Sequence, residues 1–321
     1  MGCTTCRCDA SISNSGNACT PLQEVAAIIV AVPTYDSTGA KNSIPVSATL
    51  NQAYFDALVN QTDDSKRWRP LPSMKNIADL RADATFFEFD DNTSEFVHEG
   101  ARKFTGLIPS LSGKGAVSPE MKAIIESIRC TDTSVYIISV GNQLIGQLSA
   151  DGLSLEPIQI DEQSIYANFM KATNAQGQHI AVQFNFAASA KDENLAMFDC
   201  SELGDANLLG LKGLLDICGE TVSTSTTTIE IKLKSNFGTP KNPIGAPGLV
   251  ITDFISSFDS VPSRVYNETD SLNVTLISVV ETSYSTYLLT FAAQTANDVI
   301  VVKPTKTGFD FDCVEDSPIE L

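Results

Sequence analysis

Short segments in which apolar and polar residues alternate recur along the first two thirds of the chain and predict β-strands. The longest apolar run, residues 25–33, belongs to a buried strand predicted over residues 24–32. In residues 180–186, Ile, Val or Phe at every second position predicts a strand with one face turned inward. Further strands are predicted over residues 134–140, 144–148, 154–160 and 164–172. The first part of the chain is therefore expected to form a sheet.

A long β-hairpin is the clearest strand pair in this region. Residues 85–89 (TFFEF) predict its first strand and residues 90–92 a turn. The second strand is predicted to start at residues 95–97 and to continue to residues 104–107.

One amphipathic helix is predicted over residues 119–129. Ser118 is a suitable N-cap and Pro119 suits the first helical position. Apolar residues then follow at the spacing of one helix face, at Met121, Ile124, Ile125 and Ile128. Residues 207–217 predict a short helix or a strand, but two glycines within this segment argue against a regular element.

Residues 51–81 contain prolines and no sustained period, so we interpret them as an exposed excursion with one helical turn at residues 52–59. This segment contains the only tryptophan of the chain, Trp68, between two basic residues, Arg67 and Arg69. Tryptophan and arginine are enriched at protein interfaces, so we expect a subunit contact here. A solvated loop and a nucleic-acid contact are the alternatives.

The chain is expected to be mainly β with one or two short helices, in two domains. Residues 221–229 are rich in serine and threonine and are interpreted as a linker that leads into a strand over residues 227–234. The first domain would cover residues 21–220 and the second residues 221–321. In the second domain, short strands at regular spacing predict an immunoglobulin-like β-sandwich, at residues 249–254, 272–280, 287–291 and 299–303.

Composition and charge narrow the function. With 43% hydrophobic residues, the chain can bury a substantial core. It has 21 Lys and Arg against 39 Asp and Glu, a net charge of −18, which argues against a protein that grips phosphate backbones. No apolar run is long enough to span a membrane.

Candidate catalytic and metal-binding residues are few. His98 and His179 are the only two histidines of the chain, which removes most histidine-dependent chemistry, so we expect neither an enzyme nor a cofactor. A cysteine-rich leader over residues 1–20 contains a thiol cluster that could bind zinc or an iron–sulfur centre, formed by Cys3, Cys6, Cys8 and Cys19. No histidine and no regular element lies near to orient these thiols, so we expect a flexible leader without a metal. Without a signal peptide the thiols are expected to be reduced, and the scattered cysteines to be buried free thiols: Cys130, Cys200, Cys218 and Cys313.

The order of these elements resembles that of a siphovirus-like phage tail tube protein over roughly residues 20–220. The segments that suggest it are VPTYDSTGAKNSIPV, RADATFFEFDDNTSEFVHEGARKFTG, IRCTDTSVYIISVGNQLIG and IQIDEQSIYANF. The resemblance implies a tail-tube-like β-barrel or sandwich domain that assembles into stacked hexameric rings, followed by the immunoglobulin-like domain on the outside. DNA would leave the virion through an acidic conduit without specific binding.

The resemblance also implies partners and a location. The chain would bind copies of itself and other tail proteins, without a membrane, and would be made in the host cytoplasm and reside in the virion tail. Its expected subunit contacts are Arg67, Trp68, Arg69, Phe87, Phe89, Phe96 and Val97. Another virion structural protein, such as a head–tail connector, tail terminator or capsid decoration subunit, is the nearest alternative. A cell-surface binding module is a third possibility.

Overall fold

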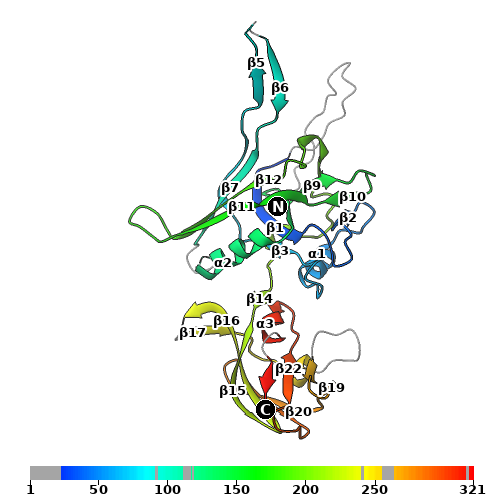
Figure 1. Cartoon of the computed structure of the whole chain (residues 1–321), viewed down its shortest axis with the longest axis vertical. Helices are drawn as coiled ribbons and strands as arrows, with labels where there is room; N and C mark the ends of the chain where they lie inside the picture. The colour runs from blue at the N-terminus through cyan, green and yellow to red at the C-terminus, as the bar shows by residue number, and fades with distance from the viewer. Residues whose placement is uncertain are drawn as a thin grey trace. The chain divides into compact units, whose positions relative to one another are not determined.

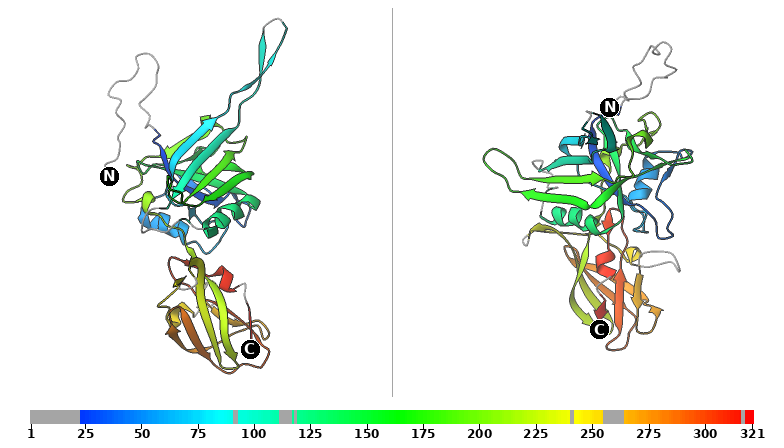
Figure 2. Two further views of the ribbon diagram at one scale, coloured as in Figure 1. Left: turned by 90° about the vertical axis from the view of Figure 1, so that its left-hand side faces the viewer. Right: turned by 45° about the horizontal axis from the view of Figure 1, so that its top comes forward.

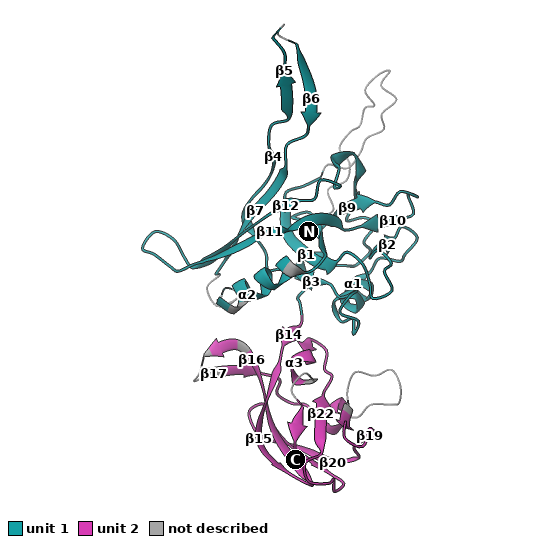
Figure 3. Cartoon of the chain, in the orientation of Figure 1, with its two compact units in different colours: residues 1–213 teal, residues 214–321 magenta. Residues whose placement is uncertain are grey.

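The computed structural model describes residues 23–90, 93–110, 117, 119–239, 242–254, 264–315 and 318–321. The chain is mainly β, with 48% strand and 11% helix, which confirms the predicted fold class. It divides into two compact units, Met1–Gly213 and Leu214–Leu321 (Figure 3). The predicted leader, with its four cysteines, lies outside the described residues.

Unit 1 is built on one large sheet in the strand order β2-β10-β9-β8-β11-β12-β7-β4 (Figure 1). Beside this path, β1 pairs with β8 and β3, and β13 pairs with β9. The strands are β1 (Ala26–Pro33), β2 (Ile44–Pro45), β3 (Arg69–Pro70), β4 (Lys75–Arg81), β7 (Arg102–Pro109), β8 (Thr133–Ser139), β9 (Leu144–Leu148), β10 (Ser154–Glu156), β11 (Ile158–Met170), β12 (His179–Phe186) and β13 (Leu195–Phe198). A separate two-stranded ribbon consists of β5 (Thr85–Glu88) and β6 (Ser94–His98).

One hydrophobic core holds this sheet together. It contains Phe104 from β7, Val135 from β8, Ile158 from β11 and Phe184 from β12. The rings of Phe104 and Phe184 stack with their centroids 5.0 Å apart. Burying side chains of this size stabilises the fold by about 1.5–3 kcal/mol each. Because alternate residues of each strand point into this core, the opposite residues form a second, open face.

Two α-helices of unit 1 lie close to their predicted positions, and the first begins at an N-cap. α1 (Gln52–Val59) has Asn51 as its N-cap, whose side chain accepts a hydrogen bond from the Tyr54 amide. It is a full helix rather than the predicted single turn, because Phe55 and Val59 are buried. α2 (Pro119–Ser127) continues into the 3₁₀ helix η1 (Ile128–Cys130), close to the predicted bounds. Short 3₁₀ helices also occur at η2 (Asp192–Asn194) and η3 (Leu208–Gly210).

Unit 2 is built on two larger sheets with one core between them, and β14 and β23 form a separate two-stranded sheet. The first has the order β15-β16-β21-β20, with β17 beside β16, and the second the order β19-β18-β22-β24. Ile231 and Leu289 of the first sheet and Val302 of the second share the core. The elements are β14 (Leu215–Asp216), β15 (Cys218–Ser225), β16 (Thr228–Thr239), β17 (Asn242–Gly245), η4 (Ile251–Asp253), β18 (Arg264–Asn267), β19 (Leu272–Asn273), β20 (Leu276–Ser283), β21 (Thr286–Phe291), β22 (Val299–Lys303), β23 (Phe309–Asp310), α3 (Asp312–Glu315) and β24 (Ile319–Glu320).

Two local predictions for this region are wrong. The serine- and threonine-rich residues 221–229 are not a linker, because they form the end of β15, a tight turn and the start of β16, and the units divide after Gly213 instead. The strand predicted over residues 249–254 is the 3₁₀ helix η4 and its flanking residues. Its buried residues Leu249 and Phe254 gave an apolar pattern that does not distinguish a strand from a short helix.

The expectation of free thiols is also wrong for unit 2. Cys218 at the start of β15 and Cys313 in α3 form a disulfide across a sequence separation of 95. Next to it, β14 and β23 pair in parallel, Leu215 with Phe309. The first and last parts of unit 2 are therefore joined both by hydrogen bonds and covalently. Cys200 in unit 1 is disulfide-bonded as well.

Candidate functional site: a projecting β-arm

The most distinctive surface of unit 1 is a β-ribbon that projects from one edge of the sheet, which we call the arm and define as residues 82–101. It contains β5 and β6 and continues β4 and β7 beyond the sheet (Figures 1 and 2). Every described residue of β5 and β6 is exposed. The predicted hairpin therefore exists, with its distal half outside the fold.

Apolar side chains cover both faces of the arm. Phe86 and Phe96 lie opposite each other in the ribbon with ring centroids 5.9 Å apart. Phe87 and Phe89 lie 4.9 Å apart. Phe86 and Phe87 are consecutive strand residues and so point to opposite faces. Together with Val97, these side chains are 45–58% exposed, so the arm carries an uncovered aromatic pair on each side.

The arm is also acidic throughout. Between Arg81 and Arg102 the sequence contains no lysine or arginine but has six acidic residues, Asp83, Glu88, Asp90, Asp91, Glu95 and Glu99. Carboxylates between aromatic rings keep such a ribbon soluble while it is uncovered. They also define its complement, because a partner surface for the arm has to offer apolar area and positive charge.

Ion pairs fix the base of the arm to the rest of unit 1. Arg81, the last residue of β4, pairs with Glu99 at 2.7 Å and with Asp192 of η2 at 2.8 Å. Arg102, the first residue of β7, pairs with the same Asp192 at 3.1 Å. Arg102 also makes a bidentate pair with Asp79 of β4. Asp192 therefore holds both strands of the arm base at once, and we call this group the clamp.

The Arg102 side chain is the centre of the clamp. Its guanidinium carbon lies 4.5 Å from the ring centroid of Phe186, a cation–π contact. Burial opposes the charge of this side chain, but hydrogen bonds and the charges of Asp79 and Asp192 outweigh burial and raise the pKa of Arg102. The Arg102 side chain is therefore held in its charged form.

An open cleft of about 1180 Å³ lies beside the clamp. Its lining includes Phe96 of the arm, Asp161 of β11, Lys191 at the start of η2 and Glu193 within η2. Lys191 and Glu193 pair with each other at 3.7 Å. The lining of the cleft therefore combines acidic and basic side chains, and it also includes His98.

The other predicted contact residues lie elsewhere, and for two of them the prediction of exposure is wrong. Trp68 is only 3% exposed, because its ring packs against Phe55 of α1 at 5.7 Å and Tyr136 of β8 at 4.9 Å. Arg67 is 6% exposed. The segment before β3 is thus folded onto the sheet, and the Trp68 side chain is buried within unit 1 instead of being exposed for a subunit contact.

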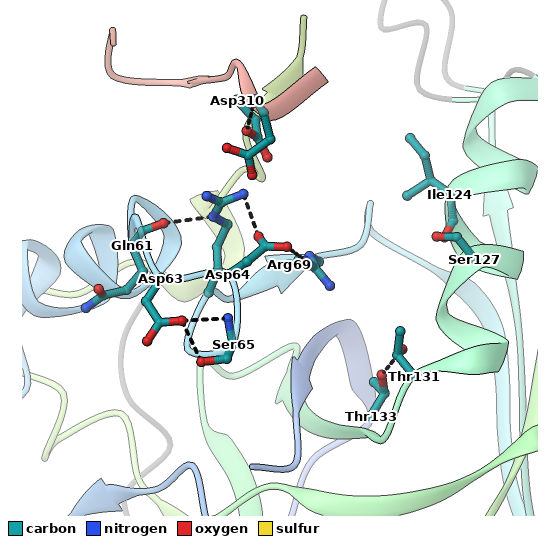
Figure 4. A network of polar contacts seen from close by, with 12 residues as sticks. Gln61, Asp63, Asp64, Ser65, Arg69, Ile124, Ser127, Thr131, Thr133 and Asp310 are labelled. Atoms are coloured by element: carbon teal, nitrogen blue, oxygen red, sulfur yellow. Dashed lines mark hydrogen bonds and ion pairs between the residues drawn. The ribbon is translucent and has the colours of Figure 1, made fainter. Parts of the chain in front are cut away.

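Arg67 and Arg69 belong to a local polar network (Figure 4). Arg67 donates a hydrogen bond to the Gln61 carbonyl at 2.8 Å and pairs with Asp64 at 2.7 Å. Arg69 pairs with the same Asp64 at 2.8 Å. Both arginines therefore find their partners within three to six residues along the chain, and this network stabilises the loop before β3.

The sequence predicted the arm but not the clamp. Phe87, Phe89, Phe96 and Val97 were expected at a contact and all lie on the arm. Arg81 and Arg102 are the first basic residues on either side of the acidic segment, so the sequence does indicate where the arm begins and ends. Their shared partner, Asp192, is far along the chain and could not be recognised without the fold.

Each of the two histidine rings contacts a nearby backbone carbonyl through Nδ1. His98 contacts the carbonyl of Glu99, and His179 contacts that of Gly177. Among the described residues, no helix is long and apolar enough to cross a membrane. No family model matches the chain, and no curated protein or solved structure similar to it was found.

Proposed function

We propose that this chain is a structural subunit that assembles with copies of itself through the arm. The observation that carries the proposal is the ribbon of β5 and β6, with an exposed aromatic pair on each face. An isolated two-stranded hairpin is marginally stable in water, and exposed apolar patches mark interaction sites. Docking would cover these faces and order the arm.

The clamp supports a role in assembly. A tether that only has to reach a partner can be flexible, whereas a strand pair that has to dock in one direction benefits from a fixed base. Asp192 and the two arginines give the arm such a base. Pre-ordering of this kind lowers the entropy cost of association.

Among assembling proteins, the function best matched is a tail tube subunit of a siphovirus-like phage. The order of elements supports it: an early strand, a long hairpin, a helix, a meander and a second β unit. The subunit would form stacked hexameric rings in the virion tail, together with other tail proteins. The net charge of −18 supports a conduit that DNA passes without sticking, because like charges repel.

Negative-stain electron microscopy of the purified full chain tests this proposal. We expect long regular cylinders, and we expect a variant that lacks residues 87–97 to remain folded and unassembled. Single rings that never stack would favour a connector or terminator subunit instead. A full chain that stays monomeric at every concentration and salt would contradict the proposal.

A further inference from the structure

The open face of the sheet next to the arm has an unusual composition for this acidic chain. Four neighbouring strands form it, in the order β4-β7-β12-β11. Since Phe104, Ile108, Val182 and Phe184 point into the core, the residues between them point outward. The register places outward residues side by side, Leu80 next to Lys103 and Thr105 next to Gln183.

Positive charge on this face is unpaired. Lys75 on β4 and Lys103 on β7 are exposed, and neither makes an ion pair with a described carboxylate. By contrast, Lys41, Lys66 and Arg102 all pair with acids. Most of the described cations of unit 1 pair with an acid, and among those without a described ion pair Lys75 and Lys103 lie on this face.

Opposing acids on the same face are scarce. Outside the irregular segment at residues 162–165, the outward positions of the four strands carry one carboxylate, Asp161. Most other outward positions are uncharged, among them Thr105, Gln183 and Asn185. The face is therefore weakly cationic in a chain whose net charge is −18.

The face also offers uncovered apolar area. Leu80 is 68% exposed, Tyr166 46% and Met170 41%, and they come from the two outermost strands, β4 and β11. A surface that combines free lysines with exposed apolar side chains is complementary to an acidic ribbon that carries aromatic rings. The arm, residues 82–101, has both properties.

We infer that the arm of a second copy of this chain lies on this open face, with Lys75 and Lys103 against its carboxylates. This inference rests on the proposed function and specifies its contact. The arm of the same copy does not cover the face, because it continues the strand direction away from the sheet (Figure 2). Each copy then has one arm and one acceptor face, so the contact is head-to-tail and propagates from copy to copy.

Charge reversal of the full chain tests the inference. We expect Lys75→Glu with Lys103→Glu to weaken self-association, measured by sedimentation velocity, by at least about tenfold, because like charges then meet. The matched control is Lys212→Glu with Lys232→Glu, two lysines off this face without a described ion pair. Thermal unfolding of both variants shows whether the fold is kept.

Rescue makes the test specific. Glu88→Lys with Glu95→Lys reverses the arm, and alone it should also weaken association. Copies that carry both reversals should associate like the native chain, and recovery of association would support the contact directly. If the face variant assembles normally while deletion of residues 87–97 prevents assembly, the arm docks elsewhere and only this inference fails. If neither change matters, the proposed function fails too.

A polyanion is the other occupant that free lysines could suit. Titration of the full chain with a duplex DNA probe distinguishes it. Tight binding that is lost in the Lys75→Glu, Lys103→Glu variant, with self-association unchanged, would overturn the inference. No measurable binding, with association lost in the variant, is the result we expect.

Discussion

Gly100 occupies the point where the arm leaves the sheet. A Cβ atom at this position would lie well inside van der Waals contact of the Ala82 carbonyl on the opposite strand. The two strands cross closely here, where the Ala82 amide donates to the Ala101 carbonyl at 2.9 Å. Because Gly100 has no side chain, the two strands can approach closely here, and this approach sets the direction of the arm.

We therefore predict that Gly100→Ala displaces the arm and destabilises unit 1 by about 1–3 kcal/mol, as overpacking typically does. Urea unfolding would measure the free energy, and sedimentation velocity the loss of association. Gly177→Ala is the matched control, because a Cβ there meets no atom within 4 Å. Equal stability of the two variants would show that the crossing tolerates a side chain.

Asp36 carries a pH-dependent contribution to the loop after β1. Its carboxylate accepts hydrogen bonds from the Thr38 hydroxyl at 2.6 Å and from the Thr38 and Ala40 amides at 2.9 Å. These bonds, the Thr38 side chain first, lower the pKa of Asp36 from 3.8 to about 2. Because the pKa of Asp36 is lower in the folded chain than in the unfolded chain, the ionised carboxylate stabilises the loop at a pH above its unfolded pKa. This stabilisation is lost as the pH falls through its folded pKa.

The expected result is that the loop is stable above about pH 4 and loses this contribution between about pH 4 and pH 2. In Asp36→Asn this part of the acid dependence should disappear. Carboxyl chemical shifts followed by NMR from pH 6 to pH 1.5 would report the midpoint. A midpoint at the ordinary value for aspartate would mean that the loop does not hold the carboxylate.

Trp68 shows how a residue can mislead. Its neighbours Lys66, Arg67 and Arg69 are basic, and a tryptophan among basic residues is typical of an interface. The Trp68 ring nevertheless fills a space between α1 and β8. Tyr136, which forms one wall, is far along the chain, so burial of Trp68 depends on tertiary packing. A local pattern contains no information about that partner.

Elements with strong local signals were predicted well. Residues 299–303 are β22 as expected, and the helix predicted over residues 119–129 is α2 with η1. Alternation and caps act within a few residues, so the sequence shows them directly. The failures, such as residues 249–254, involve short apolar segments whose conformation is decided by the core around them.

At the scale of elements, the disulfide between β15 and α3 should contribute strongly to unit 2. It closes a loop with a sequence separation of 95, and a cross-link of that length stabilises by about 2–4 kcal/mol. We predict that Cys218→Ser with Cys313→Ser lowers the melting temperature of unit 2 within the full chain. Dithiothreitol should lower the melting temperature of unit 2 in the native chain and should not lower that of unit 2 further in the variant, although it also reduces the disulfide of Cys200 in unit 1. Unchanged melting in all three samples would contradict this prediction.

For the whole molecule, the sequence predicted the arm, which we propose as a contact element, whereas its proposed docking surface became visible only in the fold. The expected acidic lining of a conduit stays a prediction. The open face of β4, β7, β12 and β11 does not supply it. Outside the irregular segment at residues 162–165, its outward strand positions carry two lysines and one carboxylate, that of Asp161. An acidic lining would have to come from other surfaces of the assembled copies.

The central claim is that the aromatic faces of the arm hold copies of the chain together. Sedimentation velocity of Phe87→Ser with Phe96→Ser, one ring from each face, tests it most directly. The control is Val250→Ser with Leu272→Ser, two apolar residues of unit 2 that are 54% and 64% exposed. We predict large assemblies for the native chain and the control and a monomer for the arm variant. Native-size assemblies formed by the arm variant would contradict the account.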